Sequence, residues 1–499
     1  MAPPTAPIDP RTPVVVAVGQ VTQRVDDPSD ALEPTALLAT AARTAESDAG
    51  AAGLLAGLDT LAVIRILSHR YRDPAALVAS EVGIAPARTI TTDDGGNYPQ
   101  TLLNRACLEI QAGRSEGWLI GGAEAWRSRS AAQAAGLDLG WSDQGEDVEP
   151  TEEVRNPYKL FLPHEIERQA ILPAEVYALF ENAYRAAKGW SIDEHRDRLG
   201  QLWAGFSEVA ATNPHAWIRE ARTPAEIRDP SPANRMVGFP YTKLMNANNA
   251  VEQAACVVVV PAERARALGI ATDRWVFPWS GSDAHEHWFV SHRWSLGGAP
   301  AVGDAGRAAL DGAGLGIDDI DLVDVYSCFP SAVQIAAEEL GLGDDRPLTV
   351  TGGLSFAGGP WNDYVSHSIA TMVERLREQP EARGLVTANG GYLTKHAMGI
   401  YSATPPPRPF RHANPQATVD ARPRRELDES VDGPVTVESA VVTHDRGGAP
   451  SHALVACLTP EGRRAWGRTV DPDAMARFTT SETSGDPATL DPTGAFHFT

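Results

Sequence analysis

The feature that most constrains this chain is an alternation of short apolar segments with alanine-rich segments. It runs through about the first 125 residues and starts again near residue 275. Short runs rich in Val and Ile indicate buried strands, and the alanine-rich segments have the spacing of helices. Strands that alternate with helices form parallel sheets with helices on both faces. We therefore predict an α/β fold made of two successive units of similar size, although no clean sequence repeat is visible.

The elements of both units can be placed by residue. In the first unit, strands are expected at Val14–Gly19, Leu58–Leu67, Thr89–Thr92, Gly117–Ile120 and Val251–Val260, and helices at Asp30–Gly50, Asp73–Val82 and Asn97–Ala112. In the second unit, strands are expected at Ile320–Val325, Gly384–Ala388 and Met398–Ser402, and helices at Asp304–Gly312, Ser331–Leu340 and Trp361–Arg377. Asn97 and Gln100 have the spacing of a helix N-cap and its reciprocal partner.

Two further regions differ in texture from these units. Residues 128–250 carry helix candidates at Pro173–Ala187 and Ile192–Ala211, so they are predicted to be a helical insertion. Three prolines at 405–407 predict a stiff linker, and the segments around Asp445–Gly448 predict a β-hairpin. The expected domains are 10–260 with the insertion at 128–250, then 261–404, and finally a β-rich module at 405–499.

Charge and cysteine usage restrict the class of protein. The chain has 65 Asp and Glu against 43 Lys and Arg, a net charge of −22, which argues against binding nucleic acid or an anionic membrane surface. Only four of the cations are lysines. The N-terminus has no secretory pattern, no apolar run is long enough to span a membrane, and the four cysteines are scattered. A cytoplasmic enzyme with free cysteines and no metal site is expected.

Candidate functional residues cluster at strand ends, which are the favoured ligand positions of open α/β sheets. Asp93–Gln100 links a strand to the helix at Asn97, Tyr326–Phe329 follows the strand at 320–325, and Asn389–Tyr392 follows the strand at 384–388. Each has a purely structural alternative: a well-capped helix for the first, and a buried apolar side chain for Cys328. His285 and His287 lack a carboxylate or cysteine partner at metal spacing, so no metal is expected there.

Several segments together resemble the thiolase superfamily, and most closely its sterol-carrier-protein-type branch. They occur in the family's order and cover most of residues 10–404: the Asn97 helix with Ile110–Gly113, Ile120–Glu124, Pro240–Met245, Val251–Ala255, Val325–Phe329, Gly352–Pro360 and Asn389–Gly391. The C-terminal module resembles the oligonucleotide/oligosaccharide-binding-like addition of thiolase-like proteins of type 1. The resemblance implies a duplicated, five-layered α-β-α-β-α core with a helical loop insertion, coenzyme A thioester substrates, no permanently bound cofactor, and a homodimer.

The chain departs from the family at its catalytic positions. The family's nucleophilic cysteine opens the helix that here begins at Gly96 and Asn97, and neither position holds a cysteine. Its Gly-His-Pro motif appears with Gly359 in place of the histidine, and tyrosine, Tyr326, replaces the histidine of its His-Asp-Cys-Phe motif. Asn389 stands where the family has a second cysteine. Because covalent catalysis needs an activated nucleophile beside a base, ordinary acyl transfer is not expected.

Other groups remain that can act on a thioester. Expected catalytic residues are Tyr326 as a general acid or base, Asn389 as a polarising group, and Cys328 and His396. Expected substrate or coenzyme contacts are Gly96, Asn97, Lys243, Gly359, Gly390, Gly391 and Lys395.

Three hypotheses on function follow from these expectations. The first is a divergent acyltransferase-type enzyme, related to acetyl-CoA acetyltransferases, that acts on an acyl-CoA from lipid metabolism. The second is a retro-aldolase acting on a β-hydroxyacyl-CoA, because tyrosine at these positions resembles the thiolase-like steroid aldolases. The third is a non-catalytic acyl-CoA-binding scaffold.

Overall fold

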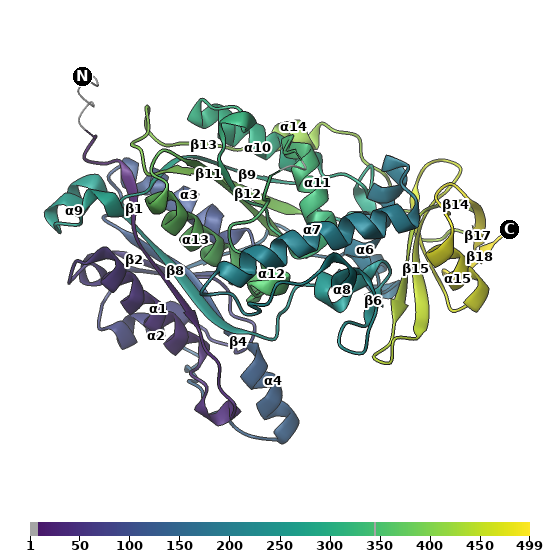
Figure 1. Cartoon of the computed structure of the whole chain (residues 1–499), viewed down its shortest axis with the longest axis horizontal. Coiled ribbons are helices and arrows are strands. Elements are labelled where there is room, and N and C mark those ends of the chain that lie inside the picture. The colour runs from purple at the N-terminus through teal and green to yellow at the C-terminus, as the bar shows by residue number, and fades with distance from the viewer. Residues whose placement is uncertain (1–7, 344–345) are drawn as a thin grey trace.

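The computed structural model describes residues 8–343 and 346–499, and its N-terminal half is built on a six-stranded sheet (Figure 1). β2, β3, β4 and β5 run parallel, whereas β8 is antiparallel to both of its neighbours, β1 and β4. The order across the sheet is β1 (Pro13–Thr22), β8 (Glu252–Pro261), β4 (Trp118–Ala125), β2 (Thr60–Val63), β3 (Arg88–Thr92) and β5 (Glu152–Val154).

The C-terminal half repeats this plan with a five-stranded sheet. Its order is β10 (Leu322–Asp324), β11 (Arg383–Gly390), β12 (Lys395–Ser402), β9 (Phe277–His285) and β13 (Arg411–Ala413). β10 is parallel to β11 and β13 to β9, while the other pairs are antiparallel. The prediction of purely parallel sheets was therefore wrong: both sheets are mixed.

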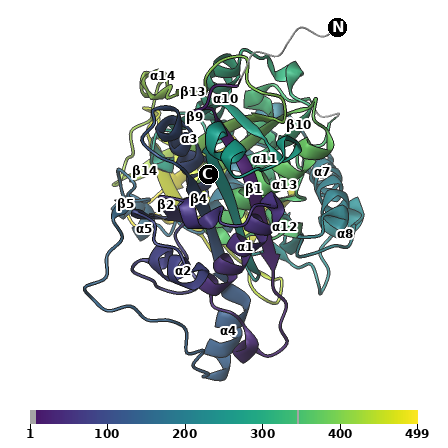
Figure 2. The same ribbon diagram turned by 90° about the vertical axis from the view of Figure 1, so that its left-hand side faces the viewer.

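The two sheets and their helices form five layers. α3 (Tyr98–Gln111) and α13 (Tyr364–Glu378) pack between the sheets and contact strands of both. α1 (Pro34–Ala49) and α2 (Pro74–Val82) cover the outer face of the first sheet, and α10 (Pro300–Ala313) covers the second, with α11 (Pro330–Leu340) packed beside α10 (Figures 1 and 2). This arrangement confirms the predicted α-β-α-β-α fold class.

Between β4 and β8 the chain forms mostly helices, as the sequence predicts. They are α4 (Trp126–Ala135), α5 (Pro163–Glu167), α6 (Pro173–Lys188), α7 (Ile192–Thr212) and α8 (Pro224–Arg228), with the 3₁₀ helix η3 (Lys243–Met245). The remaining short helices are α9 (Ala262–Ala267), α12 (Gly353–Phe356), α14 (Gln416–Asp420), α15 (Pro472–Thr480), η1 (Pro28–Asp30), η2 (Leu55–Gly57), η4 (Thr272–Arg274), η5 (Val290–His292), η6 (Ile317–Asp319) and η7 (Trp361–Asp363).

A third sheet forms the β-rich C-terminal module, at the yellow end of the chain in Figure 1. Its order is β16 (Arg464–Thr469), β15 (Pro450–Leu458), β14 (Gly433–His444), β17 (Pro487–Leu490) and β18 (Phe496–Phe498), and β6 (Met236–Gly238) pairs with β14 and with β7 (Tyr241–Thr242). Arg464 fixes this sheet to the core: it is fully buried, forms a bidentate ion pair with Glu438, and donates to the carbonyl oxygens of Val290 and Arg293.

Local sequence signals explain several helix ends, and one predicted cap is wrong. Asp73 caps α2 by accepting from the Ala76 N–H at 3.0 Å, and Ser191 caps α7 by accepting from the Glu194 N–H. Asn97, in contrast, has helical backbone angles and makes no capping hydrogen bond. Gln100 instead donates to Asn104 and accepts from Tyr401, because the helix is buried between two sheets that supply those partners.

Candidate active site

The candidate site lies between the two sheets, where the ends of three strands meet. Gly96 lies in the loop after β3, Tyr326 in the loop after β10, and Asn389 in β11 next to its last residue. The side chains of Tyr326 and Asn389 are buried, with 8% and 4% of their surface exposed. Three predicted segments that lie far apart in the sequence therefore form one polar centre.

Tyr326 occupies the space beside Gly96. A Cβ atom built on Gly96 would lie 2.5 Å from Tyr326 Oη and 2.6 Å from the carbonyl oxygen of Asn389, both far inside van der Waals contact. In the described chain, the Tyr326 hydroxyl has no hydrogen-bond partner, whereas its backbone N–H donates to Thr387 Oγ1 at 2.9 Å. Burial raises the pKa of Tyr326 above its usual value, so the phenol stays protonated and acts as a hydrogen-bond donor.

Asn389 is oriented by a residue that the sequence did not single out. Its Nδ2 donates to Tyr177 Oη at 3.0 Å and lies 3.9 Å from Cys328 Sγ. Tyr177, on α6, donates to the Gly391 carbonyl and accepts from the Leu393 N–H, so its hydroxyl is fully used. Oδ1 of Asn389 is buried and has no partner among the described residues.

Cys328 and His396 are poorly suited to proton transfer. Burial raises the pKa of the Cys328 thiol to about 12, so the thiolate is not accessible near neutral pH. Burial, with a contribution from the nearby Arg293 charge, lowers the pKa of His396 to about 3. The imidazole Nε2 lies 3.1 Å from the Leu393 carbonyl oxygen. His396 is the cross-strand partner of Asn389 in the β11–β12 pair, but within the described ranges no hydrogen bond joins its imidazole to Tyr326 or Asn389.

Lys395 and Asn97 form the second side of the centre. Lys395 Nζ donates to the Asp94 carbonyl and to Asn156 Oδ1, and it lies 5.0 Å from the centre of the Tyr98 ring. Burial lowers the pKa of Lys395 to about 8. Oδ1 of Asn97 is buried without a partner in the part of the chain that the structure describes. Both side chains lie close to Gly390: a Cβ atom on this glycine would be 2.5 Å from Asn97 Oδ1 and 2.8 Å from Lys395 Cε.

The remaining predicted contacts lie along a neighbouring segment. A Cβ on Gly359 would approach Asn249 Oδ1 to 2.9 Å, so Asn249 fills the space beside Gly359. The same segment is joined to the site through the Ala247 N–H, which donates to the Cys328 carbonyl at 3.1 Å. Lys243 lies at the start of this segment with an exposed side chain, and Gly391 takes a left-handed turn with φ of 72°.

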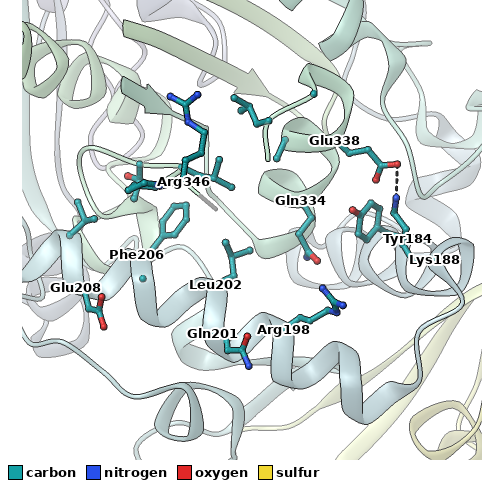
Figure 3. A pocket seen from close by; sticks show the side chains of 18 of the residues that line it. Tyr184, Lys188, Arg198, Gln201, Leu202, Phe206, Glu208, Gln334, Glu338 and Arg346 are labelled. Carbon is teal, nitrogen blue, oxygen red and sulfur yellow. Dashed lines mark hydrogen bonds and ion pairs between the residues drawn. The ribbon is translucent and has the colours of Figure 1, made fainter. Parts of the chain in front are cut away.

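A cavity of about 970 Å³, which no sequence pattern predicts, opens between α7 and α11 (Figure 3). Its wall combines apolar side chains such as Leu202 and Phe206 with the cations Lys188, Arg198 and Arg346. A Cβ on Gly353 would lie 2.6 Å from the Phe206 ring and 2.7 Å from Ser327 Oγ. Gly353 therefore lies between Phe206, which lines this cavity, and Ser327, on the loop that carries Tyr326 and Cys328.

Within residues 8–343 and 346–499, no group of three or more His, Cys, Asp and Glu side chains is arranged to hold a metal ion. None of the helices described is both long and apolar enough to cross a membrane. All four cysteines are free and buried.

Comparison with known proteins decides the family. The model of the thiolase-like protein type 1 additional C-terminal domain matches residues 415–495. The crystal structure of a monomeric SCP2-thiolase like protein type 1 from Mycobacterium smegmatis matches this chain with a TM-score of 0.84 and 30% sequence identity. The match covers 99% of this chain and 100% of that protein's chain. This chain belongs to the SCP2-thiolase-like proteins of type 1. The predicted resemblance, including the added C-terminal domain, is confirmed.

Other proteins are similar to this chain at lower identity or over a smaller part of its length. An acetyl-CoA acetyltransferase from Syntrophomonas wolfei is 29% identical over 143 residues, and one from Methanothermobacter thermautotrophicus is 25% identical over 241 residues. The matches cover 28% and 45% of this chain but only 34% and 60% of those enzymes. The Ltp2-ChsH2(DUF35) aldolase and human mitochondrial 3-ketoacyl-CoA thiolase, at 20% and 16% identity, share the fold, with TM-scores of 0.60 and 0.58; each match covers 79% of this chain and nearly all of the other.

Proposed function

We propose that this protein binds an acyl-CoA thioester non-covalently at the centre formed by Gly96, Tyr326 and Asn389. The observation that carries the proposal is that Asn389 Oδ1 is buried without a hydrogen-bond partner in the described chain. The hydroxyl of Tyr326, a residue that is itself 8% exposed, lies beside Gly96 and makes no hydrogen bond to a described residue. A buried polar group without a partner costs about 1–3 kcal/mol. A ligand with both an acceptor and a donor, such as a thioester carbonyl beside an amide, offsets that cost.

The proposal excludes an acyl-enzyme at the family's nucleophile position. Gly96 has no side chain, and Tyr326 fills the place where one would begin. Cys328, the cysteine closest to this position along the loop, keeps its proton because of its raised pKa. His396, the candidate base, is bonded away from the centre. Because nucleophilic catalysis needs a nucleophile and an adjacent base together, we infer that binding and polarisation of the carbonyl are what this centre does.

The cavity between α7 and α11 supplies room for the rest of such a ligand. Its volume, about 970 Å³, is at the upper end of the range for small-molecule sites. Arg198 lies 4.2 Å from the Trp190 ring centre and 3.3 Å from Glu194, and Lys188 pairs with Glu338, so these cations are partly neutralised. We therefore assign the cavity to the pantetheine or acyl chain rather than to phosphate groups.

Isothermal titration with acetyl-CoA tests the proposal. Tyr326→Phe removes only the hydroxyl, so we expect binding about 3–10-fold weaker, the usual effect of losing one hydrogen bond. Tyr158→Phe, a change at an exposed tyrosine, serves as the matched control and should leave the affinity unchanged. The proposal fails if the wild-type protein does not bind acetyl-CoA, or if both variants bind as tightly as the wild type.

One observation favours a second function, cleavage of a β-hydroxyacyl-CoA. Tyr326 presents a protonated hydroxyl beside Gly96, and Lys395 has a pKa near neutral pH on the other side of the centre. In such a reaction the β-hydroxyl loses its proton to a base, and the oxygen's electron pair forms the C=O bond of a released aldehyde or ketone. The Cα–Cβ bond breaks, and its electron pair forms a thioester enolate. Tyr326 would then stabilise the enolate oxygen, and Cα would finally be protonated. Turnover of a β-hydroxyacyl-CoA that Tyr326→Phe leaves unchanged would rule this function out.

We further propose that the chain is a monomer, like the relative from Mycobacterium smegmatis, rather than the homodimer expected from the superfamily. β5 pairs with the outer edge of β3, where a second copy would otherwise add a strand. The ion pair between Arg105 and Glu152 holds β5 in place. Analytical ultracentrifugation should give the mass of one chain, and a dimer at micromolar concentration would contradict this proposal.

A further inference from the structure

A second cavity, of about 820 Å³, lies at the carboxyl ends of β2 and β3. Its wall carries five arginines, Arg65, Arg70, Arg72, Arg129 and Arg155, and we name it the arginine cleft. A protein with a net charge of −22 has few positive surfaces. Five guanidinium groups around one cavity repel each other, so this arrangement favours a bound anion.

Most of the positive charge in the arginine cleft is not neutralised by the protein. Arg65 pairs with Asp94 at 2.9 Å and Arg155 with Glu153 at 2.5 Å. Arg70, Arg72 and Arg129 form no ion pair within the described ranges. The other acidic residues of the wall are Glu149 and Glu152, and Glu152 is already paired with Arg105, which lies outside the cleft. Three guanidinium groups therefore remain without an ion pair, with the Glu149 carboxylate in the same wall and the Glu124 charge acting on Arg129.

The loop between β2 and α2, which carries Arg65, Arg70 and Arg72, is held in shape before any ligand binds. Glu124 accepts the backbone N–H groups of Leu67 and Ser68 at 2.7 and 2.8 Å. Oε1 of Gln144 accepts hydrogen bonds from the backbone N–H groups of Arg72 and Asp73, both at 2.9 Å. A preformed site binds more tightly because less ordering is needed on binding.

The topology of the sheet places the arginine cleft at a usual ligand position. The loop after β2 leads to α2 on the outer face of the sheet, whereas the loop after β3 leads to α3 between the two sheets. Two adjacent parallel strands whose connections leave toward opposite faces open a crevice at their carboxyl ends, and ligands of open α/β sheets bind there. Arg65, Thr91 and Thr92 line the cleft at these strand ends.

We propose that the arginine cleft binds a small molecule with two linked phosphate groups. The guanidinium group is a planar fork that bonds two phosphate oxygens at once, so several forks around one cavity match a diphosphate better than a single phosphate. His69 and Tyr71 also line the cleft as an edge-to-face pair whose ring centres lie 4.7 Å apart, and they add aromatic surface for a nucleobase. This proposal does not depend on acyl-CoA binding at Tyr326.

Isothermal titration of the full chain with inorganic pyrophosphate at low ionic strength tests the proposal. We expect saturable binding that is about tenfold weaker in each of Arg70→Gln, Arg72→Gln and Arg129→Gln, and absent in the triple variant. Arg446→Gln, in the exposed β14–β15 turn, is the matched control and should bind like the wild type. Thermal unfolding of each variant verifies that it is folded.

Three results would overturn the proposal: no saturable pyrophosphate binding, equal binding by the triple variant, or sulfate binding as tightly as pyrophosphate, which indicates an adventitious ion only. ADP binding more tightly than pyrophosphate identifies a nucleotide, and equal affinities identify the diphosphate alone. Loss of acetyl-CoA binding in the triple variant identifies the diphosphate as that of the coenzyme, and unchanged acetyl-CoA binding identifies a separate ligand. Each of these last results supports a diphosphate site.

Discussion

The hydroxyl of Tyr326 lies where the side chain of residue 96 would begin: a Cβ atom on Gly96 would be 2.5 Å from Tyr326 Oη. A side chain at position 96 and Tyr326 in its observed position are thus mutually exclusive. The carbonyl oxygen of Asn389, 2.6 Å from the same point, is backbone and cannot move aside. The space beside Gly96 is therefore already occupied.

Gly96→Ala should therefore destabilise the protein. Overpacking of a buried site costs about 1–3 kcal/mol, which urea unfolding would detect. Tyr326→Phe should reduce that cost only in part, because the Asn389 oxygen and a ring carbon at 3.0 Å remain. Gly205→Ala is the matched control: it lies within α7 with no atom near its Cβ position, and should stabilise by about 0.5–1 kcal/mol. Gly96→Ala with wild-type stability would contradict the close contact.

Lys395 should make stability depend on alkaline pH. Burial lowers its pKa from 10.5 to about 8, so between these values the unfolded chain binds more protons than the folded one. The contribution of Lys395 to the free energy of unfolding therefore rises as pH increases from about 8 to 10.5. Lys395→Met lacks this contribution. The stability of the wild type relative to Lys395→Met should thus improve with pH in urea titrations.

Lys159→Met, at an exposed lysine, controls for the alkaline titration of other groups. Its stability relative to the wild type should not change with pH. A difference between wild type and Lys395→Met that stays constant across this range would show that the lysine is not held in a buried setting.

Tyr177 positions the side chain of Asn389, and the Tyr177→Phe variant tests this role. The change leaves the Leu393 N–H and the Asn389 amide without their partner. We expect a loss of about 1–3 kcal/mol of stability together with weaker acetyl-CoA binding. Tyr158→Phe should change neither by more than about 0.5 kcal/mol. A stable Tyr177→Phe variant with normal binding would contradict the positioning role.

Arg464 should be essential for docking the C-terminal sheet on the core. Arg464→Met leaves the Glu438 carboxylate without its ion-pair partner. It also removes the hydrogen bonds to the carbonyl oxygens of Val290 and Arg293. The expected cost is about 3–5 kcal/mol, with faster proteolytic cleavage before residue 433. Arg463→Met, which breaks only a more exposed pair with Asp428, should cost at most about 1 kcal/mol. Equal effects of the two changes would contradict this role.

Sequence reasoning located most of the core strands and helices because strand and helix periodicity is local, whereas the five-layered arrangement was implied by the resemblance to the thiolase superfamily. It missed β9, whose sequence contains proline, glycine and two serines and lacks an apolar run. Those serines, Ser280 and Ser282, are nevertheless buried, because their hydroxyls donate to carbonyl oxygens of α10. Such pairing depends on a neighbouring helix and leaves no periodic signal.

Several residues of the site were predicted from the sequence, but the contacts between their side chains were not. Strand-end positions identified Tyr326, Cys328 and Asn389, since strand ends follow from the alternation itself. Tyr177 comes from α6, more than 200 residues from Asn389, so no local pattern links the two. The contact of Tyr326 with Gly96 likewise exists only after both sheets pack on α3.

Native mass spectrometry of the wild-type protein with acetyl-CoA, followed by denaturation of the same sample, tests the central claim most directly. The account predicts a one-to-one complex that returns to the mass of the bare chain when denatured, because binding at Tyr326 and Asn389 forms no covalent bond. Either the absence of any complex or a denatured chain that retains the acetyl group would contradict it.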